Sequence, residues 1–301
     1  NEDPQNDILI DLEQINKSID LKPNFLHKLL LINNFPQCIL DLLIKFFYIN
    51  EESKQYFKIV SSILYCIAKL LSFKDFQEFF VNNDIISHAM NLISHESSKI
   101  ARESIHIVSK LMFTIIQTDY PIPEYFVYHI SININLYKTK PTKYAVKIFS
   151  IIAHYYPNKE ILVEAIPTIL ELFEQAAKKT FQPIISIRRE ESKKVAQKRE
   201  FNSEIDGIYD RSYDPILKYI VQTIYYILES DFSFYFHYQD FFEFLFYNVN
   251  GFSTTLTDKF LVSYTFKILL LIIYNNEDEA TRMVSLIGNF YHIKKNFHHN
   301  I

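Results

Sequence analysis

The chain has very few of the residues that build tight turns, disulfide frameworks and thiolate metal sites. Of its 301 residues, 3 are glycine, 2 are cysteine and none is tryptophan. Glycine is the residue that most readily takes a left-handed backbone conformation. Its scarcity therefore argues against a fold of many strands and tight turns, and against a glycine-rich phosphate loop. Two cysteines are too few for a disulfide framework or a cysteine-based zinc site. We expect a reducing compartment and predict no metal and no cofactor.

Long apolar runs and an excess of positive charge are missing as well. The most apolar stretches, such as Ile268–Ile273, are too short to span a bilayer, so we expect no membrane insertion. The formal net charge is −4, whereas proteins organised around nucleic acid are more often basic. These absences favour another protein as the partner, with no nucleic acid expected. They also favour a cytoplasmic location, with nuclear or cytoskeletal association as the alternatives.

Apolar residues at helical spacing are abundant. Along Lys54–Leu71 they recur every three or four residues, which is typical of a helix with one buried side; they are Phe57, Val60, Ile63, Leu64, Ile67 and Leu71. The other side of this stretch carries Lys58, Ser62, Tyr65 and Lys69. Comparable stretches start near Lys99, Lys143, Lys218 and Lys259. The pattern predicts an all-α fold.

These stretches repeat at a regular distance. The equivalent basic positions are 44, 41, 75 and 41 residues apart, if they are taken as Lys58, Arg102, Lys143, Lys218 and Lys259. A charged insertion of about 35 residues accounts for the one long step. Periods of about 40–47 residues with two or three helices are those of HEAT and armadillo repeats.

The order of elements within residues 82–113 is a short helix, a second helix, a polar loop and a long helix. This order resembles an armadillo repeat, and residues 33–295 as a whole are similar to armadillo and HEAT arrays. The chain departs from the pattern in lacking the usual glycine turn between the early helices. The resemblance implies a right-handed α-solenoid of about five degenerate repeats. It also implies that the last helix of each repeat lines a concave groove in which extended peptides are held.

Composition divides the chain into five segments. They are an acidic N-terminal segment with capping helices (1–32), a first set of repeats (33–177), a charged insertion (178–212), a second set of repeats (213–295) and a tail (296–301). We predict that the insertion projects from the surface with one solvated helix. Its paired basic residues suit a nuclear-import signal, but interleaved glutamates favour a solvated helix with ion pairs four residues apart.

The polar sides of the long helices supply the candidate site. The residues predicted to line the groove are Lys58, Tyr65, Lys69, Arg102, His106, Lys110, Lys143, Lys147, His154, Lys218, Gln222, Lys259, Ser263 and Lys267. Because most of them are basic, we predict that the groove holds an acidic, extended segment of a partner protein. The alternative is that they are ordinary solubilising side chains on an exposed helix face.

The other notable patterns favour structural roles. Residues 232–247 hold ten aromatic side chains in sixteen positions. They are predicted to form one helix that is buried between repeats, with a partner-binding surface as the alternative. His88, His95 and His106 have no carboxylate or cysteine at ligand spacing. Cys38 and Cys66 are expected in the core rather than as nucleophiles. We predict that the protein is not an enzyme.

Four functions remain in competition. The first is a non-catalytic scaffold or adaptor, and the second is a carrier like importin-alpha. Proteins of that family clamp basic cargo with an array of tryptophans and asparagines, whereas this chain has no tryptophan and its predicted groove is basic. The third is a structural subunit of a cytoskeletal or ciliary assembly, which a large exposed apolar face would favour. The fourth is an enzyme or its regulatory subunit, for which no nucleophile and base are arranged in the sequence.

Overall fold

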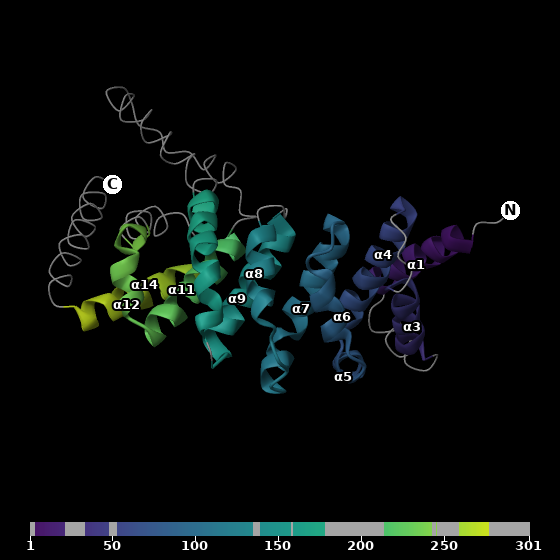
Figure 1. Cartoon of the computed structure of the whole chain (residues 1–301), viewed down its shortest axis with the longest axis horizontal. Coiled ribbons are helices and arrows are strands. Elements are labelled where there is room, and N and C mark those ends of the chain that lie inside the picture. The colour runs from purple at the N-terminus through teal and green to yellow at the C-terminus, as the bar shows by residue number, and fades with distance from the viewer. Residues whose placement is uncertain are drawn as a thin grey trace, which may run out of the picture. The chain divides into compact units, whose positions relative to one another are not determined.

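The computed structural model describes residues 4–21, 34–47, 53–134, 139–157, 159–177, 214–242, 245 and 259–276. Every regular element in these ranges is a helix and none of them contains a strand, so the predicted all-α class is confirmed for this part of the chain (Figure 1). The predicted insertion, the helix expected over 278–295 and the tail lie outside the described residues. The chain forms two compact units, Asn1–Ile148 and Phe149–Ile301, which we call unit 1 and unit 2.

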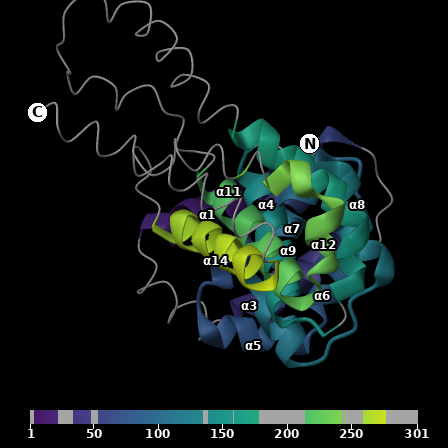
Figure 2. The same ribbon diagram turned by 90° about the vertical axis from the view of Figure 1, so that its left-hand side faces the viewer.

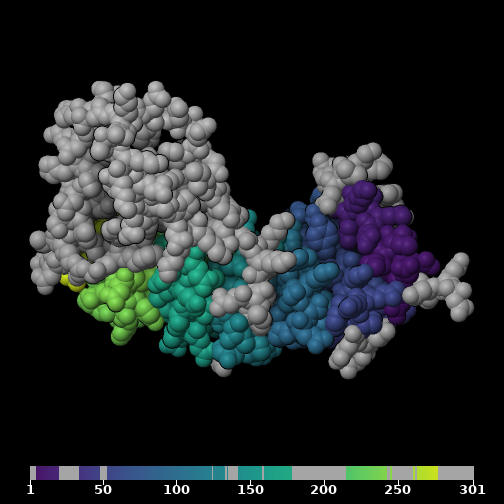
Figure 3. Space-filling view, turned by 90° about the horizontal axis from the view of Figure 1, so that it is seen from above, coloured from purple at the N-terminus to yellow at the C-terminus, as the bar shows by residue number. Residues whose placement is uncertain are grey.

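Unit 1 is built from the first seven labelled helices and the start of the eighth. They are α1 (Pro4–Leu21), α3 (Phe35–Phe47), α4 (Lys54–Leu70), α5 (Lys74–Asn82), α6 (Ile85–Leu92), α7 (Ser98–Gln117), α8 (Glu124–Asn133) and α9 (Thr139–Tyr155). Helix α4 packs against α1, α3 and α7, and α7 also packs against α6. Figure 2 gives a second view of these helices, and Figure 3 shows α1 in purple directly against its blue neighbours.

The chain builds its turns from asparagine and aspartate in place of glycine. Asn34, Asp84 and Asp119 have positive φ angles of 51°, 60° and 50°. Asparagine and aspartate tolerate this left-handed region better than other residues with a Cβ atom. Asn34 and Asp84 directly precede α3 and α6, and Asp119 follows α7. Three such residues explain how a helical chain with so little glycine turns between its elements.

The core of unit 1 follows the predicted stripe of α4. Ile63, Leu64 and Ile67 are fully buried, and Phe57 at the edge of the stripe is half-buried. The helix begins where the Oγ of Ser53 accepts a hydrogen bond of 3.1 Å from the backbone N–H of Tyr56. This cap satisfies one of the amides that have no partner inside the helix. The periodic sequence and the cap together determine where α4 lies and which side it buries.

Unit 2 contains the end of α9 and the helices that follow it. They are a 3-10 helix η2 (Lys159–Ala165), a helix over 166–177, α11 (Asp214–Ser230), α12 (Ser233–His237), a helical turn over 239–242 and α14 (Lys259–Asn275). Helices α11 and α14 pack against each other. The sequence predicts one α-helix over 160–177, but its first part is the tighter 3-10 form.

The aromatic segment is not the single straight helix that the sequence predicts. Helix α12 ends at His237, and Tyr238 leaves the helical conformation with a φ angle of −132°. The break places Phe234 and Tyr235 in the core from one side and Phe242 from the other, with ring centroids of Tyr235 and Phe242 5.2 Å apart. A straight helix with aromatic rings on all sides would leave many of them in water. The break reduces that exposure.

None of the described helices is long and apolar enough to cross a membrane.

Candidate functional site

The predicted basic positions of unit 1 lie on three successive helices. We call the six cations among them the basic surface: Lys58 and Lys69 of α4, Arg102 and Lys110 of α7, and Lys143 and Lys147 of α9. Helices α4 and α7 are packed together. The ring of His106 on α7 stacks on that of Tyr144 on α9, with centroids 4.2 Å apart and planes 4° from parallel. The predicted residues of unit 1 are therefore brought onto neighbouring elements.

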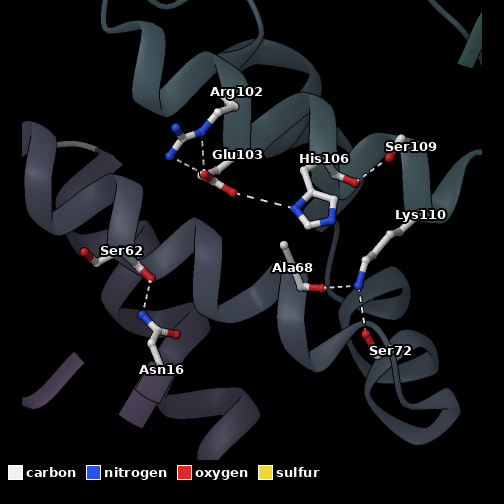
Figure 4. A network of polar contacts seen from close by, with 9 residues as sticks. All are labelled: Asn16, Ser62, Ala68, Ser72, Arg102, Glu103, His106, Ser109 and Lys110. Atoms are coloured by element: carbon white, nitrogen blue, oxygen red, sulfur yellow. Dashed lines mark hydrogen bonds and ion pairs between the residues drawn. The ribbon is translucent and has the colours of Figure 1, made fainter. Parts of the chain in front are cut away.

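A buried carboxylate lies beside the basic surface. Glu103 is 4% exposed, and its Oε1 accepts hydrogen bonds of 2.7 Å from both Nε and a terminal nitrogen of Arg102 (Figure 4). The Nδ1 of His106 lies 3.6 Å from Oε2 of the same carboxylate. Arg102 is therefore held by its neighbour rather than extended toward a partner. The sequence analysis missed Glu103, although a charged residue among the apolar positions of 100–108 was a usable signal.

Lys110 joins α7 to the end of α4. Its Nζ donates a hydrogen bond of 2.7 Å to the carbonyl of Ala68 and one of 2.8 Å to the Oγ of Ser72 (Figure 4). The last carbonyls of a helix have no partner within it, and this end of the helix carries partial negative charge. An ammonium group from the neighbouring helix satisfies both needs. Lys110 is half-buried and is a packing residue as well as a cation.

Three lysines, one from each helix, act on one another electrostatically; we call Lys69, Lys110 and Lys147 the lysine cluster. Burial and then the charges of Lys69 and Lys147 lower the pKa of Lys110 to about 8. Burial and the charge of Lys143 lower the pKa of Lys147. The charged neighbours that shift both groups are cations. Positive charge is therefore concentrated here on partly desolvated side chains.

Aromatic rings border the lysine cluster. The Nζ of Lys69 lies 5.0 Å from the centroid of the Tyr65 ring, within range of a cation–π interaction. Burial raises the pKa of Tyr144, and the charge of Glu103 adds to this effect, while Arg102 and Lys69 oppose it. Tyr144 therefore lies within the field of both the Glu103 network and the lysine cluster.

In unit 2 the predicted lysines are covered by rings. The Nζ of Lys218 lies 4.2 Å from the ring centroid of Phe260. The Nζ of Lys267 lies 4.6 Å from the ring of Tyr264 and 5.4 Å from that of Tyr225. These distances are typical of cation–π contacts. The positive charges of unit 2 are thus directed onto the protein's own aromatic side chains.

His154 and Gln222 connect helices of unit 2. The ring of His154 stacks on that of Tyr226, with centroids 3.9 Å apart and planes 8° from parallel. The Oγ of Ser150 donates a hydrogen bond of 3.2 Å to the side-chain oxygen of Gln222. These contacts tie α9 to α11, and the hydroxyls of Tyr226 and Tyr264, 3.0 Å apart, tie α11 to α14. Both predicted residues serve in packing.

The hydroxyl pair has unequal acidity. Burial and the hydrogen bond with Tyr264 raise the pKa of Tyr226. Burial also acts on Tyr264, but hydrogen bonds from Tyr226 and Gln222 and the charges of Lys267 and Lys218 outweigh it and lower the pKa of Tyr264. Tyr226 is therefore the donor of the pair. This assignment gives the hydrogen bond a structural role between two helices.

Two predicted residues contribute little that can be placed. Ser263 is exposed on α14, and the side chain of Lys259 lies outside the described residues. The histidines that are close in sequence take separate positions. His88 packs edge-on against Phe47, and His95 against Phe57, each with ring centroids 5.4 Å apart.

The described residues contain no group of three histidine, cysteine, aspartate or glutamate side chains that could hold a metal ion. Cys66 is buried, and burial raises the pKa of its thiol to about 12. A thiol with so high a pKa is a poor nucleophile, because the thiolate is the reactive form. Cys38 is exposed rather than in the core, as the sequence predicts for both cysteines.

Comparisons with protein-family models, with curated proteins and with solved structures give no match to this chain.

Proposed function

We propose that the protein is a non-catalytic binding scaffold with an α-solenoid architecture of the armadillo and HEAT kind, and that its basic surface holds an acidic, extended segment of another protein. The observation that carries the proposal is the concentration of lysines on α4, α7 and α9. The groups that shift the pKa of Lys110 and of Lys147 are other lysines, not carboxylates of the chain. An acidic ligand supplies the missing negative charge.

The spacing of the helices suits an extended chain. Packed helices lie about 8–10 Å apart, and an extended chain advances about 3.3 Å per residue. An acidic side chain at about every third position of the ligand therefore meets one cation from each successive helix. Each exposed ion pair contributes only about 0.2–1 kcal/mol. Several together supply useful affinity, which salt weakens by screening.

A charge-reversal experiment tests this function. The probe is a synthetic peptide with glutamate at every third position and glycine and serine between. The test variant carries Lys58→Glu and Lys143→Glu, and leaves Arg102 in its pair with Glu103. We expect it to bind the peptide about tenfold more weakly or worse, since two attractive pairs become repulsive and about 1.4 kcal/mol corresponds to a factor of ten. Fluorescence anisotropy at low and high salt measures the loss.

The matched control carries Lys45→Glu and Lys74→Glu, which change the net charge equally on exposed positions of α3 and α5. It should bind like the unmodified protein at the same ionic strength. Equal binding by the unmodified protein and the test variant, with no dependence on salt, would show that the basic surface is only a solvated face.

A structural subunit of a larger assembly is the second candidate function. One side of α8 exposes apolar side chains at helical spacing: Tyr125, Tyr128 and Ile132 are 51%, 46% and 50% exposed. Three such residues in a row suit packing against another helix. A partner that ignores the charge reversals but is lost on Tyr125→Ser with Tyr128→Ser would favour this function. The carrier resembling importin-alpha has no such observation in its favour, because the chain contains no tryptophan.

A further inference from the structure

We infer that the lysine cluster is a binding site for a phosphate dianion, on three ammonium groups that α4, α7 and α9 bring together. The cluster is part of the basic surface, so a phosphate carried by a peptide rests on the function proposed above. A free phosphate ion does not depend on it.

The first argument is placement. Lys110 is held by its bonds to the carbonyl of Ala68 and the Oγ of Ser72, so its Nζ has a defined position. Lys69 and Lys147 lie close enough to act on its charge. The Ser72 hydroxyl accepts a bond from Lys110 and keeps its own proton for donation. Three ammonium groups and a hydroxyl from separate elements make a set of donors that suits an anion with several oxygens.

The second argument is the balance of charge. Glu103 is occupied by Arg102 and His106, and it precedes Lys110 by seven residues, about 10 Å along the helix. The cations of the cluster therefore face one another. Half-buried like charges raise the free energy of the fold, and a bound anion reverses that effect. Three positive charges match a phosphate, with about two negative charges near neutral pH, better than a carboxylate with one.

The third argument concerns the helix end. The carboxyl end of α4 carries partial negative charge and by itself repels an anion. Lys110 is bonded to that end through Ala68 and offsets this charge. Lysine also suits the role, because its ammonium is a compact charge with three donors that commonly binds phosphate.

The test uses inorganic phosphate as the first probe and peptides as the second. The test variant is Lys69→Gln with Lys147→Gln, which leaves the Lys110 cap in place. Its matched control is Lys58→Gln with Lys143→Gln, which removes the same charge from the same two helices outside the cluster. Phosphate at about ten times its dissociation constant should raise the melting temperature of unit 1 by about 2–4 °C. Chloride at equal ionic strength serves as the reference.

The control variant should keep the phosphate-dependent rise and the test variant should lose it. Because phosphate also stabilises proteins by exclusion from their surface, equal rises in the two variants would overturn the inference. The peptide arm compares the glutamate peptide with one whose central glutamate is phosphoserine. We expect about tenfold tighter binding of the phosphopeptide, reduced to less than about twofold in the test variant.

The outcomes separate the two proposals. Equal binding of the two peptides with no effect of free phosphate overturns the phosphate site and leaves the acidic-segment function standing. A phosphate-dependent rise in melting temperature without binding of either peptide supports the site and removes the function. Sedimentation with vesicles of phosphatidylcholine, with and without phosphatidic acid, is a further arm. Binding to the phosphatidic acid vesicles alone would assign the site to a lipid headgroup and overturn its role for a free ion or a peptide.

Discussion

Lys110 in unit 1 and Lys267 in unit 2 hold the same place in the predicted repeats, each eight residues after the basic start of its helix. Their surroundings differ. Lys110 faces Lys69 and Lys147, and its pKa is lowered, whereas Lys267 lies over the rings of Tyr264 and Tyr225. The same residue at the same spacing thus has like-charged neighbours in one unit and aromatic neighbours in the other. The neighbouring helix, not the repeat position, decides what a lysine can bind.

The two units share one device. In unit 1, Lys110 donates to the carbonyl of Ala68 and the hydroxyl of Ser72. In unit 2, Lys159 donates to the carbonyl of Tyr226 and the hydroxyl of Ser230. Each acceptor pair is four residues apart at the end of a long helix. The need to satisfy a helix end is the same in both units. Unit 1 meets it from the basic surface, and unit 2 meets it from the 3-10 helix η2.

The largest expected effect is the loss of a core isoleucine in either unit. Ile63 of unit 1 and Ile220 of unit 2 are fully buried. Replacing either by alanine should lower the free energy of unfolding by about 2–5 kcal/mol, because it removes buried methyl groups and leaves a cavity. Urea denaturation followed by circular dichroism measures the change. The exposed Ile10, replaced in the same way, is the control and should change stability by less than about 0.5 kcal/mol.

The same variants test whether the units unfold separately. Cys66 is buried in unit 1, so in a Cys38→Ser background its reaction with a thiol reagent reports opening of that unit. Ile63→Ala should speed the reaction at moderate urea, and Ile220→Ala should not. Equal acceleration by both would show that the two units unfold as one.

Removal of the two lysine caps should have a smaller effect that differs between the units. Lys159→Met leaves the Tyr226 carbonyl without its ammonium donor and should cost about 1–3 kcal/mol. Lys110→Met loses the same kind of bond but also removes repulsion from Lys69 and Lys147, so we expect a smaller cost. Thermal and urea denaturation measure both. Lys45→Met on the exposed side of α3 controls for the loss of a charge. A larger cost for Lys110→Met would mean that the repulsion is negligible.

The smallest expected effect is a shift in titration. Lys110 should titrate near pH 8 in spectra of the protein labelled with 13C-lysine. Lys69→Gln or Lys147→Gln should each raise that pKa, because removing a positive neighbour favours the ammonium form. The pKa of Lys110 in the fold lies below the 10.5 of an ordinary lysine, so the unfolded chain binds more protons between these values. The contribution of Lys110 to stability therefore rises with pH from about 8 to 10.5. An unchanged pKa in both variants would show that the cluster is not coupled.

Local periodicity was sufficient to predict most of the helices. The sequence predicts long helices over 98–118 and 258–274, and the structure has α7 at Ser98–Gln117 and α14 at Lys259–Asn275. The stripe of α4 was predicted with Phe57 as its one half-buried member. Helix formation and the buried side depend on residues three and four positions apart, which a single sequence displays directly.

The chemistry of the candidate site depends on distant residues. The sequence alone determined that lysines recur on the polar sides of the long helices. The tertiary structure decided that Glu103 holds Arg102, that Lys110 caps α4 across 42 residues of chain, and that Tyr264 receives Lys267. It also decided that the aromatic segment breaks at Tyr238. The reason is physical: a side chain's charge and freedom depend on the groups that packing places around it. Those groups come from helices whose pairing a local pattern does not contain.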